Sequence, residues 1–134
     1  MAFDDAFRLS AHAVIINPAN QVLQLAATYG DRAWGLPGGA LSPGETIHEA
    51  LARECLEELG CPVEIGCLTG VYYHAAYNSQ AFIFRCDLPA NAEIRLSEEH
   101  SSFRWFPLDE LRPVQRKRVE DCLSYAGVVV SAKF

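Results

Sequence analysis

The sequence lacks the features that mark several classes of protein. Its 134 residues contain no apolar run of membrane-spanning length, no internal repeat and no low-complexity tract. The start has no basic segment followed by an apolar run, so no signal peptide is expected, and we expect a cytoplasmic protein. We therefore expect one domain spanning residues 1–134, because 50% of the residues are hydrophobic and can form one core.

The sequence also lacks the paired cysteines that are typical of disulfide frameworks and zinc sites. The five cysteines include no CxxC pair, their number is odd, and their neighbours are mostly apolar. Such cysteines are typical of reduced, mostly buried thiols in a reducing compartment, and a zinc site is not expected. They occupy positions 55, 61, 67, 86 and 122.

Basic residues are scarce in the most acidic part of the chain. Residues 39–61 contain five acids and one base, which gives −4 of the total net charge of −6. The other twelve acids and ten bases give −2. A chain with this balance has no basic footprint for long nucleic acid. An anionic small molecule would also be repelled by residues 39–61 unless a cation lay between them.

The order of the expected elements indicates an α+β domain with a mixed sheet sandwiched by helices. Residues 8–17 and 21–28 flank a turn at 17–20 and are expected to pair as a hairpin. Helices are expected over residues 46–59 and 113–126, ended by Gly60 and Gly127. The conformation of the tail, residues 128–134, stays open. The remaining expected strands are residues 33–37, 63–73, 80–88 and 103–106.

The helix expected over residues 46–59 is amphipathic. At about 100° per residue, its apolar arc contains His48, Leu51, Ala52, Cys55, Leu56 and Leu59. In the second helix, the expected apolar stripe contains Val119, Cys122, Leu123 and Ala126. The basic run at this helix is expected to form a solvated face rather than a phosphate clamp, and it consists of Arg112, Arg116, Lys117 and Arg118.

Three glutamates gather on a separate arc of the first helix. Glu54, Glu57 and Glu58 stand at i, i+3 and i+4, so their carboxylates lie on one face. A solvated face is one interpretation, because such pairs of like charges cost only about 0.2–0.5 kcal/mol each. The context favours a site for a hard cation. Gly38 and Gly39 precede the helix and allow close backbone approach, and Arg53 can orient a carboxylate.

The same residues resemble the Nudix box, G-x5-E-x7-R-E-U-x-E-E-x-G-U, where U is a bulky aliphatic residue. Every fixed residue of the pattern is present between Gly39 and Gly60, while Cys55 and Cys61 stand at the two U positions. Residues 34–38 and 104–111 also resemble the family, so the similarity spans nearly the whole chain. It implies a Nudix-type α/β/α sandwich with a box loop and helix followed by a C-terminal helix.

The resemblance implies an enzyme that hydrolyses a pyrophosphate bond in a nucleoside diphosphate linked to a further group. It implies Mg²⁺ as cofactor, with Mn²⁺ as a substitute. The implied metal ligands are Glu54, Glu57, Glu58 and the backbone carbonyl of Gly38. Glu57 is also expected to act as the general base or to orient water.

Two further catalytic contributions are expected from the resemblance. Arg53 is expected to support catalysis and, with Glu45, to hold the loop and helix together. A downstream acid is expected from Glu99, with Glu98 as its rival, although both could be first-turn acids beside a Ser97 cap.

The group linked to the diphosphate is not specified by the box. Trp34 and Tyr77 are the main candidates to bind it, although an aromatic residue is more often part of the packing. The other aromatic candidates are Tyr72, Tyr73 and Phe82, and the histidines that could contact phosphate are His12, His74 and His100. The expected partner is a small nucleotide and neither long nucleic acid nor a membrane. The resemblance is also compatible with a homodimer and with a non-catalytic nucleotide sensor.

Replacing Glu57 tests the assignment of the box directly. We expect Glu57→Gln to abolish Mg²⁺-dependent turnover and to leave the fold intact, because it removes a ligand and base but little volume. Steady-state kinetics and circular dichroism measure the two properties. Activity within about tenfold of the parent would show that Glu57 does not have this role.

Overall fold

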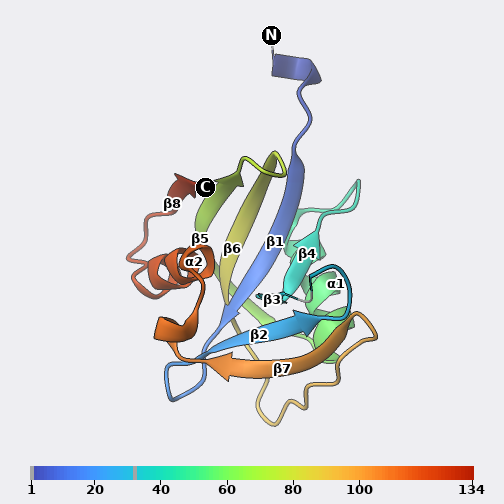
Figure 1. The fold of residues 1–134 in the computed structure, drawn as a ribbon, viewed down its shortest axis with the longest axis vertical. Coiled ribbons are helices and arrows are strands. Elements are labelled where there is room, and N and C mark those ends of the chain that lie inside the picture. Colours follow the sequence, from blue (N-terminus) through green and yellow to red (C-terminus); the bar gives the residue numbers. More distant parts are fainter. Residues whose placement is uncertain (1, 32) are drawn as a thin grey trace.

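The computed structural model describes residues 2–31 and 33–134, which form two sheets and two α-helices (Figure 1). The five-stranded sheet has the order β4-β1-β6-β5-β8, and the three-stranded sheet has the order β3-β2-β7. The strands are β1 Arg8–Ile15, β2 Val22–Ala27, β3 Trp34–Gly35, β4 Gly38–Ala40, β5 Glu64–His74, β6 Ser79–Asp87, β7 His100–Phe106 and β8 Val130–Lys133. The helices are α1 Ile47–Leu59 and α2 Pro113–Leu123, with 3₁₀ turns η1 Ala2–Asp4 and η2 Leu108–Glu110.

The large sheet is mixed, as expected. β1 pairs in parallel with β6 and antiparallel with the short edge strand β4. β5 pairs antiparallel with β6 and in parallel with β8. The open question about the tail is therefore settled for residues 130–133, which extend the sheet at its far edge.

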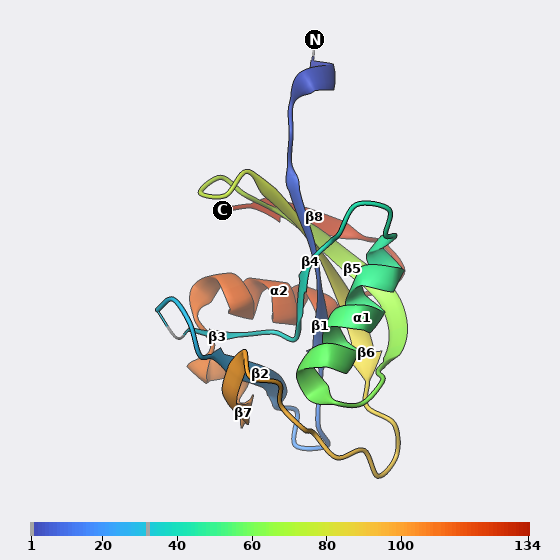
Figure 2. The ribbon, with the colours of Figure 1, turned by 90° about the vertical axis from the view of Figure 1, so that its right-hand side faces the viewer.

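The two α-helices cover opposite faces of this sheet (Figure 2). Side chains alternate along a strand, and in β1 Ala11, Ala13 and Ile15 pack with α1, while Val14 packs with α2. The core on the α1 side includes Leu51, Cys55 and Leu59, and the core on the other side includes Tyr72, Ile83 and Val119. The expected α/β/α arrangement is confirmed.

The expected hairpin between residues 8–17 and 21–28 is wrong. β1 belongs to the large sheet and β2 to the small one, and beside the turn Ile16 and Val22 form an isolated bridge instead of the start of a ladder. The turn itself forms, because the Asn17 side chain accepts the N–H groups of Ala19 and Gln21. β1 continues into parallel pairing with β6, which is distant in sequence and invisible to a local pattern.

Helix α1 has well-defined ends. Thr46 Oγ1 accepts the N–H of Glu49 at 3.0 Å, and Glu49 Oε1 accepts the N–H of Thr46 at 3.1 Å. Gly60 ends the helix in the left-handed conformation with φ 70° and donates to the carbonyl of Leu56.

The expected apolar arc of α1 is only partly correct. Leu51, Cys55 and Leu59 are buried, but Leu56 is 52% exposed, and His48 and Ala52 are also exposed. Ala50 and Glu58 are buried instead. The reason is that α1 packs against β4 as well as β1, so its buried face is rotated toward the box loop.

Helix α2 is shorter than expected. It ends at Leu123, and Ser124 caps it with φ −90° and ψ 1°, after which the chain leaves the helix. Ala126 therefore lies outside the helix and is exposed, while Val119 and Cys122 are buried as expected. All five cysteines are free thiols, and four are buried, Cys67 being the exposed one. No helix in residues 2–31 and 33–134 is long and apolar enough to cross a membrane.

The capping box makes a specific contribution to stability. We expect Thr46→Ala to lower the free energy of unfolding by about 1 kcal/mol, because it removes the acceptor for the Glu49 N–H. Urea unfolding measures this loss. Ser101→Ala, at an exposed position of β7, is the matched control and should change stability by less than about 0.5 kcal/mol. Equal effects of the two substitutions would contradict the role of the cap.

Candidate functional site

Strand β4 places the two glycines of the box beside helix α1. The antiparallel ladder links Ala13 N–H to the carbonyl of Pro37 and Leu41 N–H to that of Leu9. In an antiparallel ladder every second residue bonds to the neighbouring strand, so the N–H and carbonyl of Gly38 point away from β1. Its N–H donates to Glu58 Oε1 at 2.8 Å, so the edge of the sheet is tied directly to the helix. The role of the Gly38 carbonyl as a metal ligand stays a prediction.

The two glycines differ in what a side chain would meet: backbone at Gly38, and the Glu54 carboxylate at Gly39. Gly38 has φ +135°, and a Cβ there would lie 2.1 Å from the carbonyl oxygen of Ala11. A Cβ on Gly39 would lie 2.7 Å from the carboxyl carbon of Glu54. The absence of side chains therefore allows the Glu54 carboxylate to lie against the β4 backbone.

Arg53 links the loop, β4 and the carboxylates. Its guanidinium donates twice to Glu45, from Nε at 2.7 Å and from Nη2 at 2.8 Å, and Nη1 donates to Glu54 at 2.9 Å. Nη1 also lies 3.5 Å from Glu57 Oε2. Glu49, one turn before Arg53 on the helix, instead accepts the Thr46 N–H in the helix cap.

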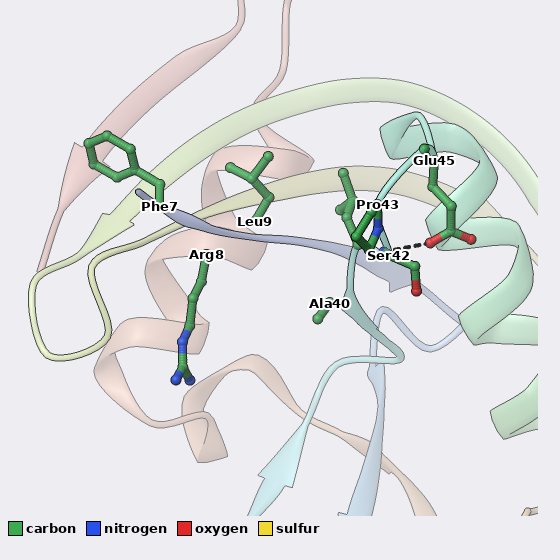
Figure 3. Close-up of a pocket in the computed structure, with 9 residues that line it drawn as sticks. Phe7, Arg8, Leu9, Ala40, Ser42, Pro43 and Glu45 are labelled. Atoms are coloured by element: carbon green, nitrogen blue, oxygen red, sulfur yellow. Dashed lines mark hydrogen bonds between the residues drawn. The ribbon is translucent and has the colours of Figure 1, made fainter. Parts of the chain in front are cut away.

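The fixed geometry of Arg53 has an electrostatic consequence. Hydrogen bonds from Arg53 and from the Ser42 N–H lower the pKa of Glu45 to about 2. In turn, the carboxylates of Glu45 and Glu54 hold the pKa of Arg53 above its usual range. Figure 3 shows Glu45 reaching Ser42 across the loop, at one side of a hollow of about 550 Å³ between this loop and the start of β1. None of the three clustered glutamates lines that hollow.

Glu58 is the buried member of the glutamate cluster. Burial raises the pKa of Glu58 to about 8, and the like charges of Glu54, Glu99 and Glu57 add to this increase. The hydrogen bond from Gly38 acts in the opposite direction. A cation bound beside these carboxylates would relieve the repulsion and favour the charged form.

The donor chemistry of this face fits a hard divalent cation, since every side-chain donor is a carboxylate oxygen. However, in residues 2–31 and 33–134 no three His, Cys, Asp or Glu side chains converge closely enough to hold an ion. In this conformation Glu58 is bonded to Gly38, and Arg53 Nη1 contacts Glu54 and Glu57. Metal binding would therefore require these side chains to reorient.

The loop before β7 brings the downstream acids toward α1. The carbonyls of Glu99 and Glu98 accept from the N–H and hydroxyl of Thr28. His100 Nε2 lies 3.9 Å from Glu58 Oε2, and because burial lowers the pKa of His100, the ring is neutral near pH 7. The negative charge of Glu99 is among the causes that raise the pKa of Glu58. The choice of Glu99 over Glu98 stays a prediction.

Two adjoining cavities lead away from Glu58. A cavity of about 280 Å³ is lined by Gly38, Gly39, Glu58 and His100 together with His12 and Trp34. A larger cavity of about 660 Å³ shares His12, Ala33 and Trp34 with it and continues to Tyr77. Trp34 and Tyr77, the two aromatic candidates, therefore line the same cavity.

The other aromatic candidates do not line this larger cavity. Tyr72 is fully buried and donates to Asp121 at 2.8 Å, and the Tyr73 hydroxyl donates to Asn78 at 2.7 Å. Phe82 packs against the core on the α1 side. His12 and His74 do line the larger cavity, whereas His100 lines the smaller one. Burial lowers the pKa of both His12 and His74, that of His12 to about 3.

The expectation of a solvated basic face on α2 is wrong for Arg118. Arg116 and Lys117 are exposed and pair with Glu120 and Asp121, but Arg118 is only 7% exposed and lines the larger cavity with Arg112. Burial lowers the pKa of Arg118 to about 10, so it is still charged near pH 7. A sequence signal existed, because Arg118 precedes the buried Cys122 by four residues, the spacing of one helix face.

Comparison with known proteins gives consistent matches. A family model described as the NUDIX domain matches residues 6–123. A MutT-like protein of Streptomyces ambofaciens is 39% identical over 98 residues, which cover 70% of this chain and 63% of that protein. An RNA pyrophosphohydrolase of Serratia proteamaculans (strain 568) is 43% identical over 60 residues, covering 45% of this chain and 34% of that protein. The match thus spans less than two thirds of either relative.

A solved structure adds a likeness in fold. The ADP-ribose pyrophosphatase of Streptococcus suis 89-1591 superposes with a TM-score of 0.76 at 20% identity, covering 96% of this chain and 100% of that chain. At this identity, the likeness concerns the fold alone.

The buried position of Glu58 predicts a pH-dependent stability in metal-free buffer. Between its ordinary pKa near 4.5 and its raised pKa near 8, the native state retains a proton that the unfolded state releases. The free energy of unfolding therefore falls as pH rises through this window. We expect Glu58→Gln to gain stability relative to the parent from pH 5 to pH 8, by on the order of 2–4 kcal/mol.

Urea unfolding in EDTA at the two pH values measures this difference. Glu57→Gln is the control, because the Glu57 side chain is 59% exposed and should change the pH dependence much less. Parallel pH profiles of the parent and Glu58→Gln would contradict the burial effect.

Proposed function

Because this chain belongs to the Nudix family, we propose that it hydrolyses the pyrophosphate bond of a nucleoside diphosphate linked to another group. The observation that carries the proposal is the junction of two features. Glu58, which shares a helix face with Glu54 and Glu57, lines a cavity that leads past Trp34 into a second cavity of about 660 Å³. Reactive carboxylates and space for a nucleotide are therefore contiguous.

A divalent cation, Mg²⁺ with Mn²⁺ as a substitute, belongs to the proposal. Its ligands would be Glu54, Glu57, Glu58 and the Gly38 carbonyl, an all-oxygen set of the kind that Mg²⁺ prefers. When bound, it would supply charge neutralisation and Lewis-acid polarisation of the phosphate oxygens. The crowding of like charges around Glu58 supports this assignment, since a cation is the natural counter-charge.

The protein's own groups divide the remaining work. Glu57 is the most exposed of the three carboxylates and is free to accept the proton of an attacking water. Arg53 contacts Glu45, Glu54 and Glu57 at once and is proposed to keep the carboxylates oriented during attack. Glu99 is proposed as an additional acid, because its charge acts on Glu58 across the site.

Trp34 and Tyr77 are proposed to bind the nucleoside or the linked group. Both line the larger cavity, and Trp34 also lines the cavity beside Glu58. Trp34 is held edge-on against Phe106, with ring centroids 5.1 Å apart, so its orientation is fixed before a ligand arrives. The free thiols fit a cytoplasmic enzyme acting on small nucleotides.

One observation favours an alternative, a nucleotide sensor without turnover. Arg53 contacts two of the proposed metal ligands, and a guanidinium left there would counter the need for a metal. The two functions differ in one measurable property. A sensor binds nucleotide without Mg²⁺ and releases it unchanged, whereas the proposed enzyme converts it.

A substrate panel tests the proposal. We expect Mg²⁺-dependent turnover of at least one of five classes: unmodified nucleoside triphosphates, oxidised nucleoside triphosphates, ADP-ribose, dinucleoside polyphosphates and 5′-triphosphorylated oligonucleotides. Chromatography separates the products. In H₂¹⁸O the label should enter a phosphate product, because water attacks phosphorus.

The control for the panel is Glu64→Gln, which removes an exposed acid on β5 outside the site and should retain parental activity. Label found only in a fragment without phosphate would refute attack at phosphorus. Tight binding of a nucleotide without turnover in Mg²⁺ would instead support the sensor.

A further inference from the structure

Arg118 is a buried cation that has no counter-ion among the described residues. Its side chain lies in α2, is only 7% exposed and lines the cavity of about 660 Å³. Nη1 donates to Gln115 Oε1 at 3.2 Å, Nη2 donates to His74 Nε2, and Nε has no partner among the described residues. Within residues 2–31 and 33–134, no carboxylate lies within ion-pair distance of Arg118.

The nearest acids are used elsewhere. Asp121 on the same helix accepts from the Tyr72 hydroxyl at 2.8 Å and from Lys117 at 3.0 Å. Asp31 lines the same cavity, but it is exposed and its Oδ1 accepts the Ala33 N–H. The helix thus neutralises its exposed cations and leaves the buried one unpaired.

Such an arrangement is costly for stability alone. An uncompensated buried charge loses its hydration without gaining an ion pair, so packing would be served better by an apolar residue. His74 and His12, the other titratable groups facing the cavity from the large sheet, are neutral near pH 7 and supply no negative charge. Arg112 at the start of α2 adds a second cation to the same lining.

We propose that this cavity binds an anionic group, a phosphomonoester or a carboxylate, through Arg118, and that the group is distinct from the pyrophosphate that is cleaved. A guanidinium matches both anions with paired N–H donors. That the anion is part of the substrate rests on the function proposed above. The binding of an anion to Arg118 does not.

The lining of the two cavities supports the separation of the two anions. Glu58 and Gly38 line only the smaller cavity, Arg118 and Arg112 line only the larger one, and His12, Ala33 and Trp34 lie between. Phosphates held beside the carboxylates therefore leave Arg118 available. A substrate with a second anionic group, on its nucleoside or on its linked group, would fill both cavities.

A metal-free titration tests the proposal without requiring catalysis. In EDTA at constant ionic strength, inorganic phosphate should shift the NMR signals of the Trp34 indole and the His74 ring and raise the melting temperature. Arg118→Gln should weaken phosphate binding at least about tenfold. Arg116→Gln, which removes an exposed cation from the same helix, is the matched control and should bind as the parent does. An equal phosphate response in all three proteins would overturn the proposal.

Stability distinguishes a binding role from a structural one. Without phosphate, Arg118→Met should melt at or above the temperature of the parent, because it removes an unpaired buried charge. Arg118→Lys should restore part of the phosphate response. A marked loss of stability in Arg118→Met, with no difference in anion binding between Arg118→Lys and Arg118→Gln, would assign Arg118 a structural role and contradict the inference.

Ligand pairs identify which part of the substrate carries the anion. Adenosine and guanosine 3′,5′-bisphosphates should bind at least about tenfold more tightly than the 5′-monophosphates if the nucleoside carries it. Ribose 5-phosphate should compete with inorganic phosphate if the linked group carries it. Binding through Arg118 in a protein without hydrolase activity would refute only the proposed function. Hydrolysis unaffected by Arg118→Gln, with no anion binding, would refute only this inference.

Discussion

The hydrogen bond from the Gly38 N–H to Glu58 joins the edge of the large sheet to the helix that carries the glutamates. It depends on β4 coming so close to β1 that no Cβ fits at Gly38, while a Cβ at Gly39 would displace the Glu54 carboxylate. The buried face of α1 is consequently turned toward β4, which leaves Leu56 in solvent and buries Glu58. The electrostatic properties of the site follow from that rotation.

Arg53 connects the box loop to helix α1 on the solvent-facing side of the site. It binds Glu45 of the loop and Glu54 of the helix, so loop and helix are held by charge as well as by packing. The Arg53 side chain is 32% exposed, and a pair this accessible contributes little to stability by itself. Its importance lies in geometry, because one guanidinium contacts the loop carboxylate of Glu45 and the helix carboxylates of Glu54 and Glu57 at once.

The sequence predicted those features of the fold that depend on neighbouring residues alone. Thr46 and Gly60 were visible as the ends of a helix, and the spacing of Glu54, Glu57 and Glu58 placed them on one face. The pairing of β1 with β6 was not visible, because the two strands are separated by more than sixty residues and nothing local specifies the partner. The burial of Arg118 was missed for a different reason. The charge of Arg118 favoured an exposed position, whereas its spacing of four residues from Cys122 places it on the buried face of α2.

The turn at residues 17–20 joins two sheets that each carry part of the site. The large sheet and α1 supply Gly38 and the glutamates, while the small sheet supplies Trp34 and the loop with Glu99. The side chain of Asn17 bonds to Gln21 through both its oxygen and its nitrogen, so this connection is stiff. The relative position of the two sheets, and with it the separation of the glutamates on α1 from Trp34, depends in part on this turn, and lengthening the turn would act on the candidate site from a distance.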